Sequence, residues 1–136
     1  MKGWLGPLAA PHDFLLDASL VEIKTCVPGS DDVTIASLQQ LDGAGEPLYL
    51  GVVRLAPATS TTPDAFTTAG LVTRIRQDIE ASQAASTEFE LRLAETGYAD
   101  GEEYARAWLT TSPVSGTFTL RLYGSRNSFV NDGEKT

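Results

Sequence analysis

The pattern of apolar residues changes near residue 57, and this change constrains the fold more than any other feature of the sequence. Before it, short apolar runs at 12–17, 19–26, 33–35 and 48–55 are separated by turn-forming residues, which is typical of β-strands. After it, apolar residues recur at helical spacing. The sequence therefore predicts an α/β fold in which strands come first and helices follow.

The strand region divides into three parts. The runs 12–17 and 19–26 are separated by Asp17 and Ala18 and predict an antiparallel hairpin. The run 33–35 predicts a third strand after a turn-rich loop. The run 48–55 is nearly all apolar with β-branched residues, so we expect a strand buried on both faces. Residues 118–123 alternate weakly, as a further strand would.

Three helices are expected after residue 57. The first is predicted to begin near Pro63 and Asp64, because proline is tolerated in a first helical turn and an acid there complements the dipole. Its apolar face comprises Leu71, Val72, Ile75 and Ile79. The second is indicated by a capping box, Thr87 with Glu90, and a stop at Gly97. The third is a short helix capped by Asp100 and Glu103.

Length and composition predict one domain. The chain has 136 residues, which suits a single hydrophobic core over 1–123 followed by a polar tail, 124–136, that we expect to be disordered. No apolar run approaches the roughly 20 residues of a membrane span, and no apolar stretch follows the first residues as in a secretory signal. Cys26 is the only cysteine, which excludes an internal disulfide and a cysteine-based zinc site. We expect a reducing cytoplasm.

The net charge of −8 argues against a free-standing, tight DNA binder. Phosphate neutralisation supplies most of the affinity of such proteins and requires a basic surface. Here only Arg74 and Arg76 lie close together in sequence. Contact with nucleic acid is therefore expected to be local, assisted by metal, or shared with a partner subunit.

The predicted hairpin brings charged residues together. With a two-residue turn, Asp13 lies opposite Glu22, with Cβ atoms about 4.5–5.5 Å apart. Lys24 shares a strand face with Glu22. Two carboxylates held this way repel each other unless a cation or proton lies between them. The group suits Mg²⁺-dependent phosphodiester hydrolysis. From spacing alone, however, a hairpin with a charged solvent face is the commoner explanation.

An ordered series of short motifs carries a family resemblance. The series is Trp4-x-Gly6-Pro7, Pro11-His12-Asp13-Phe14, Val21-Glu22-Ile23-Lys24-Thr25, Leu38-Gln39-Gln40-Leu41-Asp42 and Leu48-Tyr49-Leu50. It resembles a bacterial family of PD-(D/E)XK motif proteins related to restriction endonucleases, from Trp4 to about Tyr104. The resemblance implies a restriction-endonuclease-like mixed β-sheet of about four strands followed by two or three helices.

The same resemblance implies a chemistry and a setting. The activity would be DNA cleavage dependent on Mg²⁺ or Mn²⁺, within a restriction or phage-defence system. By position, Asp13 and Glu22 would be metal ligands and Lys24 the catalytic lysine. Gln39 or Gln40 would face the site from the next element, and we assign Gln39. The partners implied are DNA, a second copy of the chain, or subunits of a defence complex.

One departure from the family pattern keeps alternatives open. Such folds usually begin with a helix that carries a further acid, and no such helix precedes Asp13 here. The chain is therefore expected to be a shortened nuclease, or a catalytically inactive nuclease-fold subunit that acts through protein–protein contacts. A small ligand-binding α/β domain is a third alternative.

Three other residues have competing explanations. His12 could be a base or ligand beside Asp13, but a strand-end histidine near solvent is favoured, because a lone histidine rarely makes a site. Cys26 is expected to be a buried, inert thiol. Arg74 and Arg76 could contact phosphate or lie on a solvated helix face.

Overall fold

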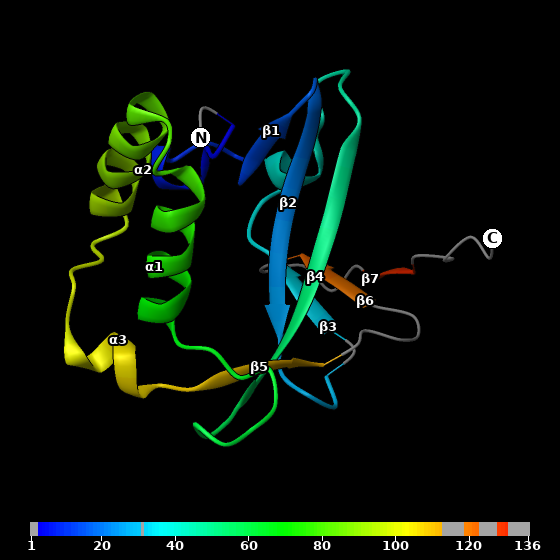
Figure 1. Ribbon diagram of the computed structural model, residues 1–136. Coiled ribbons are helices and arrows are strands. Elements are labelled where there is room, and N and C mark those ends of the chain that lie inside the picture. Colours follow the sequence, from blue (N-terminus) through cyan, green and yellow to red (C-terminus); the bar gives the residue numbers. More distant parts are fainter. Residues whose placement is uncertain (1–2, 31, 113–118, 123–127, 131–136) are drawn as a thin grey trace.

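The computed structural model describes residues 3–30, 32–112, 119–122 and 128–130. Strands come first, three consecutive α-helices follow β4, and further strands follow the helices (Figure 1). In chain order the described elements are η1 (Gly6–Leu8), β1 (Phe14–Leu16), β2 (Ser19–Cys26), β3 (Asp32–Ile35), η2 (Leu38–Leu41), β4 (Leu48–Pro57), α1 (Thr68–Ile79), α2 (Gln83–Glu95), α3 (Glu102–Arg106), β5 (Leu109–Ser112), β6 (Thr119–Leu122) and β7 (Ser128–Val130).

The main sheet has the strand order β1-β2-β4-β5. β2 pairs in parallel with β4, while β1 and β5 pair antiparallel with β2 and β4. The predicted mixed sheet of about four strands followed by helices is thus confirmed. The hairpin turn is also as expected, because Asp17 (φ 48°) and Ala18 (φ 61°) both adopt the left-handed conformation of a type I′ turn.

The predicted strand at 33–35 forms, but it lies in a second sheet with the order β3-β6-β7. The fourth strand of the main sheet is instead β5, which the sequence pattern did not predict. β6 matches the weak alternation seen at 118–123. β7 falls within the stretch predicted as a polar tail, and the other residues of 124–136 lie outside the described part of the chain.

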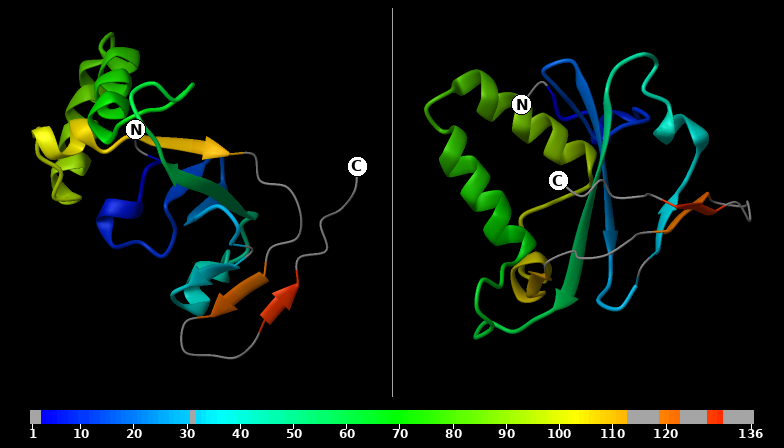
Figure 2. Two further views of the ribbon diagram at one scale, coloured as in Figure 1. Left: turned by 90° about the horizontal axis from the view of Figure 1, so that it is seen from below. Right: turned by 90° about the vertical axis from the view of Figure 1, so that its right-hand side faces the viewer.

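The molecule has three layers (Figure 2). The helices α1 and α2 lie on one side of the main sheet, and η2 with the second sheet lies on the other. On the helical side, Val72, Phe89 and Leu93 are buried against Trp4, Ile75, Ile79 and Tyr98. On the opposite side, Val33 and Ile35 are almost fully buried.

The helices begin at positions that differ from those predicted. α1 starts after Thr67, whose hydroxyl accepts the Gly70 N–H at 3.0 Å. Asp64 has a φ of 57°, so it cannot belong to a first helical turn. α2 starts after Ser82, which places Thr87 inside the helix rather than at its cap. These two predicted starts were wrong because several Ser, Thr and Asp residues compete for each cap.

The other helix predictions had mixed outcomes. The stop near Gly97 (φ 79°) is confirmed, since α2 ends at Glu95. α3 forms, but Gly101 is its N-cap residue and the Asp100 carboxylate contacts Arg76 instead.

β4 is only partly buried, and Tyr49 is exposed, so burial on both faces was a wrong prediction there. None of the helices in the described residues is long and apolar enough to cross a membrane.

An ion-pair cluster joins α1, α2 and the segment before α3. Arg76 donates from Nε and Nη2 to both carboxylate oxygens of Glu90, at 2.7 and 3.0 Å, and from Nη1 to Asp100 at 3.0 Å. Tyr98 donates to the same Asp100 carboxylate. These contacts with Arg76 lower the pKa of Glu90, and those with Arg76 and then Tyr98 lower the pKa of Asp100.

The cluster predicts a loss of stability in acid. Carboxylates whose pKa values are lowered by folding stabilise the fold above their unfolded pKa values, and this stabilisation is lost as the pH falls. The melting temperature should therefore decrease as the pH is lowered past the usual pKa values of 4.5 for Glu90 and 3.8 for Asp100. In Arg76→Met the fall should be smaller, as measured by thermal melts between pH 7 and pH 3.

A matched control is Arg106→Met, which removes the partner of Glu102. Both members of that pair are largely exposed. The melting temperature of Arg106→Met should therefore fall between pH 7 and pH 3 by the same amount as that of the wild type. Identical acid profiles for Arg76→Met and the wild type would show that the cluster contributes nothing measurable.

Candidate functional site

β2 presents Glu22 and Lys24 on one face of the main sheet. Strand geometry puts alternate side chains on the same face, as the sequence predicted. Lys24 Nζ lies 2.7 Å from Glu22 Oε1. The Glu22 side chain is 3% exposed and that of Lys24 is 18% exposed. The structure thus forms a nearly buried ion pair in a strand that is flanked by β1 and β4.

Gln40 of η2 completes this group. Its Oε1 accepts a hydrogen bond from Lys24 Nζ at 3.1 Å and a second from the Ala36 N–H at 2.9 Å. Of the two glutamines considered from the sequence, Gln40 therefore lies at the site, whereas the assigned Gln39 is exposed. A run of two glutamines in a 3₁₀ turn gives no sequence signal for which side chain points inward.

Glu22 keeps one oxygen without a hydrogen-bond partner among the described residues. That atom, Oε2, is buried, while Oε1 is bound by Lys24. A buried carboxylate oxygen without a donor is costly, so such atoms often mark a place for a ligand or ion. In this chain the atom is an oxygen donor of the kind that Mg²⁺ prefers.

Asp13 does not form the predicted cross-strand pair with Glu22. The ladder of paired residues ends at Phe14 with Val21, and the Asp13 N–H donates to the Val21 carbonyl at 3.1 Å. Its carbonyl accepts bonds from Leu5 and Gly6. This anchoring to the N-terminal segment interrupts the hairpin register, which a simple extension of the two-residue turn could not reveal.

The Asp13 carboxylate is held at the edge of β2. Oδ2 accepts the Ile23 N–H at 2.7 Å. The side chain borders an open hollow of about 500 Å³ that is also lined by Glu95 and Thr96 at the end of α2, and by Trp4, Gly6, Pro7 and Ala9. Asp13 therefore borders the helical side, whereas Lys24 contacts η2 on the opposite side.

The oxygen donors of the site suit a divalent cation, but the described residues do not form a cluster of three ligating side chains. Glu22 Oε2 offers one unpartnered carboxylate oxygen next to an ammonium. In the described ranges, however, no three His, Cys, Asp or Glu side chains lie close enough to hold a metal ion.

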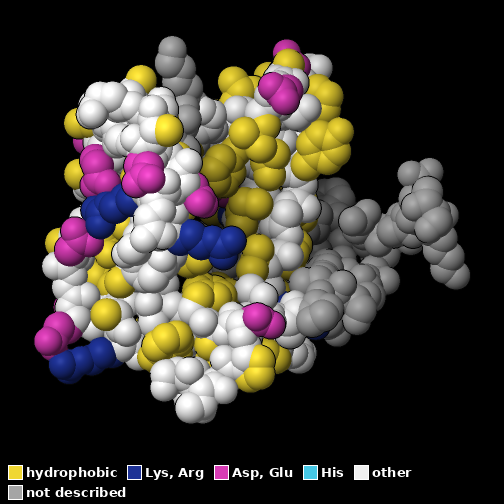
Figure 3. All heavy atoms as spheres, viewed as in Figure 1, with side chains coloured by type: hydrophobic (Ala, Val, Ile, Leu, Met, Phe, Trp, Pro, Cys, Tyr) yellow, Lys and Arg dark blue, Asp and Glu magenta, His cyan; other side chains and the backbone are white. Residues whose placement is uncertain are grey.

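The basic side chains are mostly engaged by acidic ones. In the part of the chain that the structure describes, Lys24, Arg76, Arg92 and Arg106 each form an ion pair. Arg74 is exposed on α1. Figure 3 shows Lys and Arg side chains beside Asp and Glu on this face. A continuous basic track for DNA phosphates is not formed by these residues.

His12 and Cys26 are both buried. The expectation that His12 lies near solvent was wrong, since it is 7% exposed and its Nε2 has no hydrogen-bond partner in the described residues. The N-terminal segment that binds the backbone of Asp13 was not predicted to pack there. The burial of the Cys26 thiol is confirmed.

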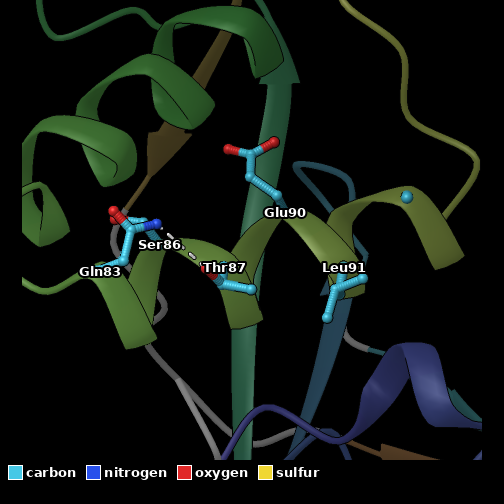
Figure 4. A pocket seen from close by; sticks show the side chains of 6 residues that line it. Gln83, Ser86, Thr87, Glu90 and Leu91 are labelled. Carbon is cyan, nitrogen blue, oxygen red and sulfur yellow. Dashed lines mark hydrogen bonds between the residues drawn. The ribbon is translucent and has the colours of Figure 1, made fainter.

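A second hollow lies along the outer face of α2 and offers little chemistry. It is lined by Gln83, Ser86, Thr87, Glu90, Leu91 and Ala94 (Figure 4). Its one carboxylate, Glu90, is bound by Arg76. No residue that the sequence singled out as catalytic lines it.

The sequence of the chain matches a known protein family. The model of a family described as "Putative PD-(D/E)XK family member" (DUF4420) matches residues 1–113. The chain belongs to this PD-(D/E)XK family. Neither the curated proteins nor the solved structures contain a match.

The part of the chain that matches the PD-(D/E)XK family includes the whole candidate site. The matched residues include Asp13, Glu22, Lys24 and Gln40, and they extend through β5. The α/β fold, with its mixed sheet followed by helices, agrees with a restriction-endonuclease-like architecture. The resemblance noted from the ordered motifs is thus confirmed at the level of the family.

Proposed function

We propose that this chain is a Mg²⁺-dependent DNA endonuclease of a bacterial restriction or phage-defence system. The observation that carries the proposal is the buried Glu22 carboxylate, with one unpartnered oxygen and Lys24 Nζ 2.7 Å from the other. Family membership makes phosphodiester hydrolysis the chemistry to expect of such a pair.

The proposed roles follow from the charges. Glu22 and Asp13 would hold the ion, which supplies Lewis-acid activation of water and of the phosphate when bound. Lys24 is a cation fixed by Glu22 and Gln40. It would donate to the attacking water or to a phosphate oxygen as negative charge develops there.

Supercoiled-plasmid nicking tests the proposal. We expect cleavage by the wild type in Mg²⁺ or Mn²⁺, and a loss of roughly 100-fold or more in Glu22→Gln and in Asp13→Asn. Each substitution keeps the shape of the side chain, so thermal melts should show folded variants. Asp17→Asn is the matched control, because it removes a carboxylate from the hairpin turn and suits its left-handed φ of 48°. Unchanged nicking in Glu22→Gln would refute the assignment.

A second candidate is a catalytically inactive subunit that keeps the nuclease fold and acts through protein contacts. The engagement of Lys24, Arg76, Arg92 and Arg106 in ion pairs favours it, because DNA binding needs free cations. This candidate predicts no cleavage by the wild type with either metal. It also predicts that Glu22→Gln leaves binding to a partner subunit unchanged.

A further inference from the structure

We infer that η2 is a lid over Glu22 and Lys24, and that the side chain of Gln40 is the latch that keeps it closed. The inference rests on the proposed function, because it concerns access to the same two side chains. It adds that the site is shut in this conformation and opens by movement of one short segment.

The Glu22 carboxylate is closed off from solvent in this conformation. Glu22 is 3% exposed, and its unpartnered Oε2 is buried. Mg²⁺ usually keeps several of its waters and binds substrate phosphate as well. An ion with its waters and a phosphodiester cannot reach an oxygen that is covered to this degree. A covering element must therefore move before Glu22 can act as a ligand.

The element that moves must lie outside the main sheet. β2 itself cannot move alone, because it is paired with β1 on one edge and along its length with β4 on the other. On the side away from the helices, β3 packs against β2 but is paired with β6 in the second sheet, whereas η2 contacts Lys24 through Gln40. In Figure 2, η2 lies on the side of the main sheet opposite the helices. η2 is therefore the cover that can be displaced without unpairing the sheet.

η2 is weakly held. None of its four residues is buried, and Leu38 is 67% exposed. Its N-cap residue, Ser37, makes no side-chain capping bond. The turn that follows contains Ala44 at φ 48° and Gly45 at φ 93°, outside any regular element. Segments with so few buried contacts open at low free-energy cost.

The side chain of Gln40 connects η2 to both sheets. The Gln40 amide oxygen accepts two bonds, from Lys24 Nζ on β2 and from the Ala36 N–H just after β3. The first ties η2 to the main sheet and the second ties it to the edge of the second sheet. The bond from the ammonium is charge-assisted and so is the stronger type. Gln39, its neighbour on the same turn, is exposed.

Amide hydrogen exchange by NMR tests the latch without metal or DNA. The reporter is the Asp42 N–H, which donates to the Gln39 carbonyl at 3.2 Å across the turn. Gln40→Ala should raise its exchange rate about tenfold or more, because two hydrogen bonds are lost. Gln39→Ala, the matched control, should exchange like the wild type. Equal rates in Gln40→Ala and the wild type would overturn the role of Gln40 as the latch.

Manganese binding, followed by the EPR signal of free Mn²⁺, separates the lid from the proposed function. If closure limits access, Gln40→Ala should bind Mn²⁺ about tenfold more tightly than the wild type or Gln39→Ala, because the open state is more populated. Equal affinity in all three proteins would overturn the lid while leaving metal binding intact. An absence of binding in all three would overturn the proposed function, and with it the need for a gate.

Discussion

Replacing Lys24 with methionine is expected to lower the free energy of unfolding by about 3 to 5 kcal/mol. The methionine preserves the length of the side chain but leaves the Glu22 carboxylate, which is 3% exposed, without its cation. The remaining partial exposure of Lys24 places the effect toward the lower end of the range. Urea denaturation followed by circular dichroism measures the change.

A double variant distinguishes the lost charge pair from lost packing. Lys24→Met combined with Glu22→Leu removes both charges, and it should recover most of the stability because no buried charge is left unpaired. If the double variant is as unstable as Lys24→Met, the pair is not the cause. A loss below about 1 kcal/mol in Lys24→Met would mean that the pair behaves as an exposed one.

Phe89→Ala is expected to cost about 3 to 5 kcal/mol of stability. Phe89 is 2% exposed and lies at the centre of the helical-side core with Val72 and Leu93. Its ring is also 6.0 Å from that of Trp4, measured between centroids. Truncation therefore leaves a cavity and loosens the N-terminal segment that positions Asp13.

The control for Phe89→Ala is Leu91→Ala on the same helix. Leu91 is 63% exposed and borders the outer hollow, so its truncation should change stability by about 0.5 kcal/mol or less. Comparable losses in the two variants, measured by the same urea titration, would contradict the proposed position of the core. If Phe89→Ala does not fold, Phe89→Leu gives a graded test of the same cavity.

The hairpin and the existence of the three helices could be predicted because they depend on local signals, but the starts of α1 and α2 were predicted wrongly. Asp17 and Ala18 suit a two-residue turn, and this turn fixed the register from Phe14 to Leu16. The position of β3 could not be predicted, because an apolar run indicates a strand but not the sheet that it joins. β5 was missed because the run from Leu109 to Ser112 is short and rich in threonine.

The candidate site was only partly predictable. Alternation along β2 placed Glu22 and Lys24 together, which needs no tertiary information. The location of Asp13 depends on the backbone bonds of Leu5 and Gly6 to its carbonyl, and these contacts within an irregular segment leave no sequence pattern. The choice between Gln39 and Gln40 depends on the rotation of one 3₁₀ turn, which is set by packing rather than by composition.

The parallel pairing of β2 with β4 has a kinetic consequence. The β1–β2 hairpin joins neighbours in sequence and can form within about 1–10 μs. β2 and β4 are instead separated by a connection that carries β3 and η2 to the other side of the sheet. Closing that loop costs entropy before any of its pairs is made, so we expect β4 to pair with β2 after the hairpin has formed. The pairs of β4 with β5 and of β3 with β6 join residues still further apart in sequence, so we expect them to form later again.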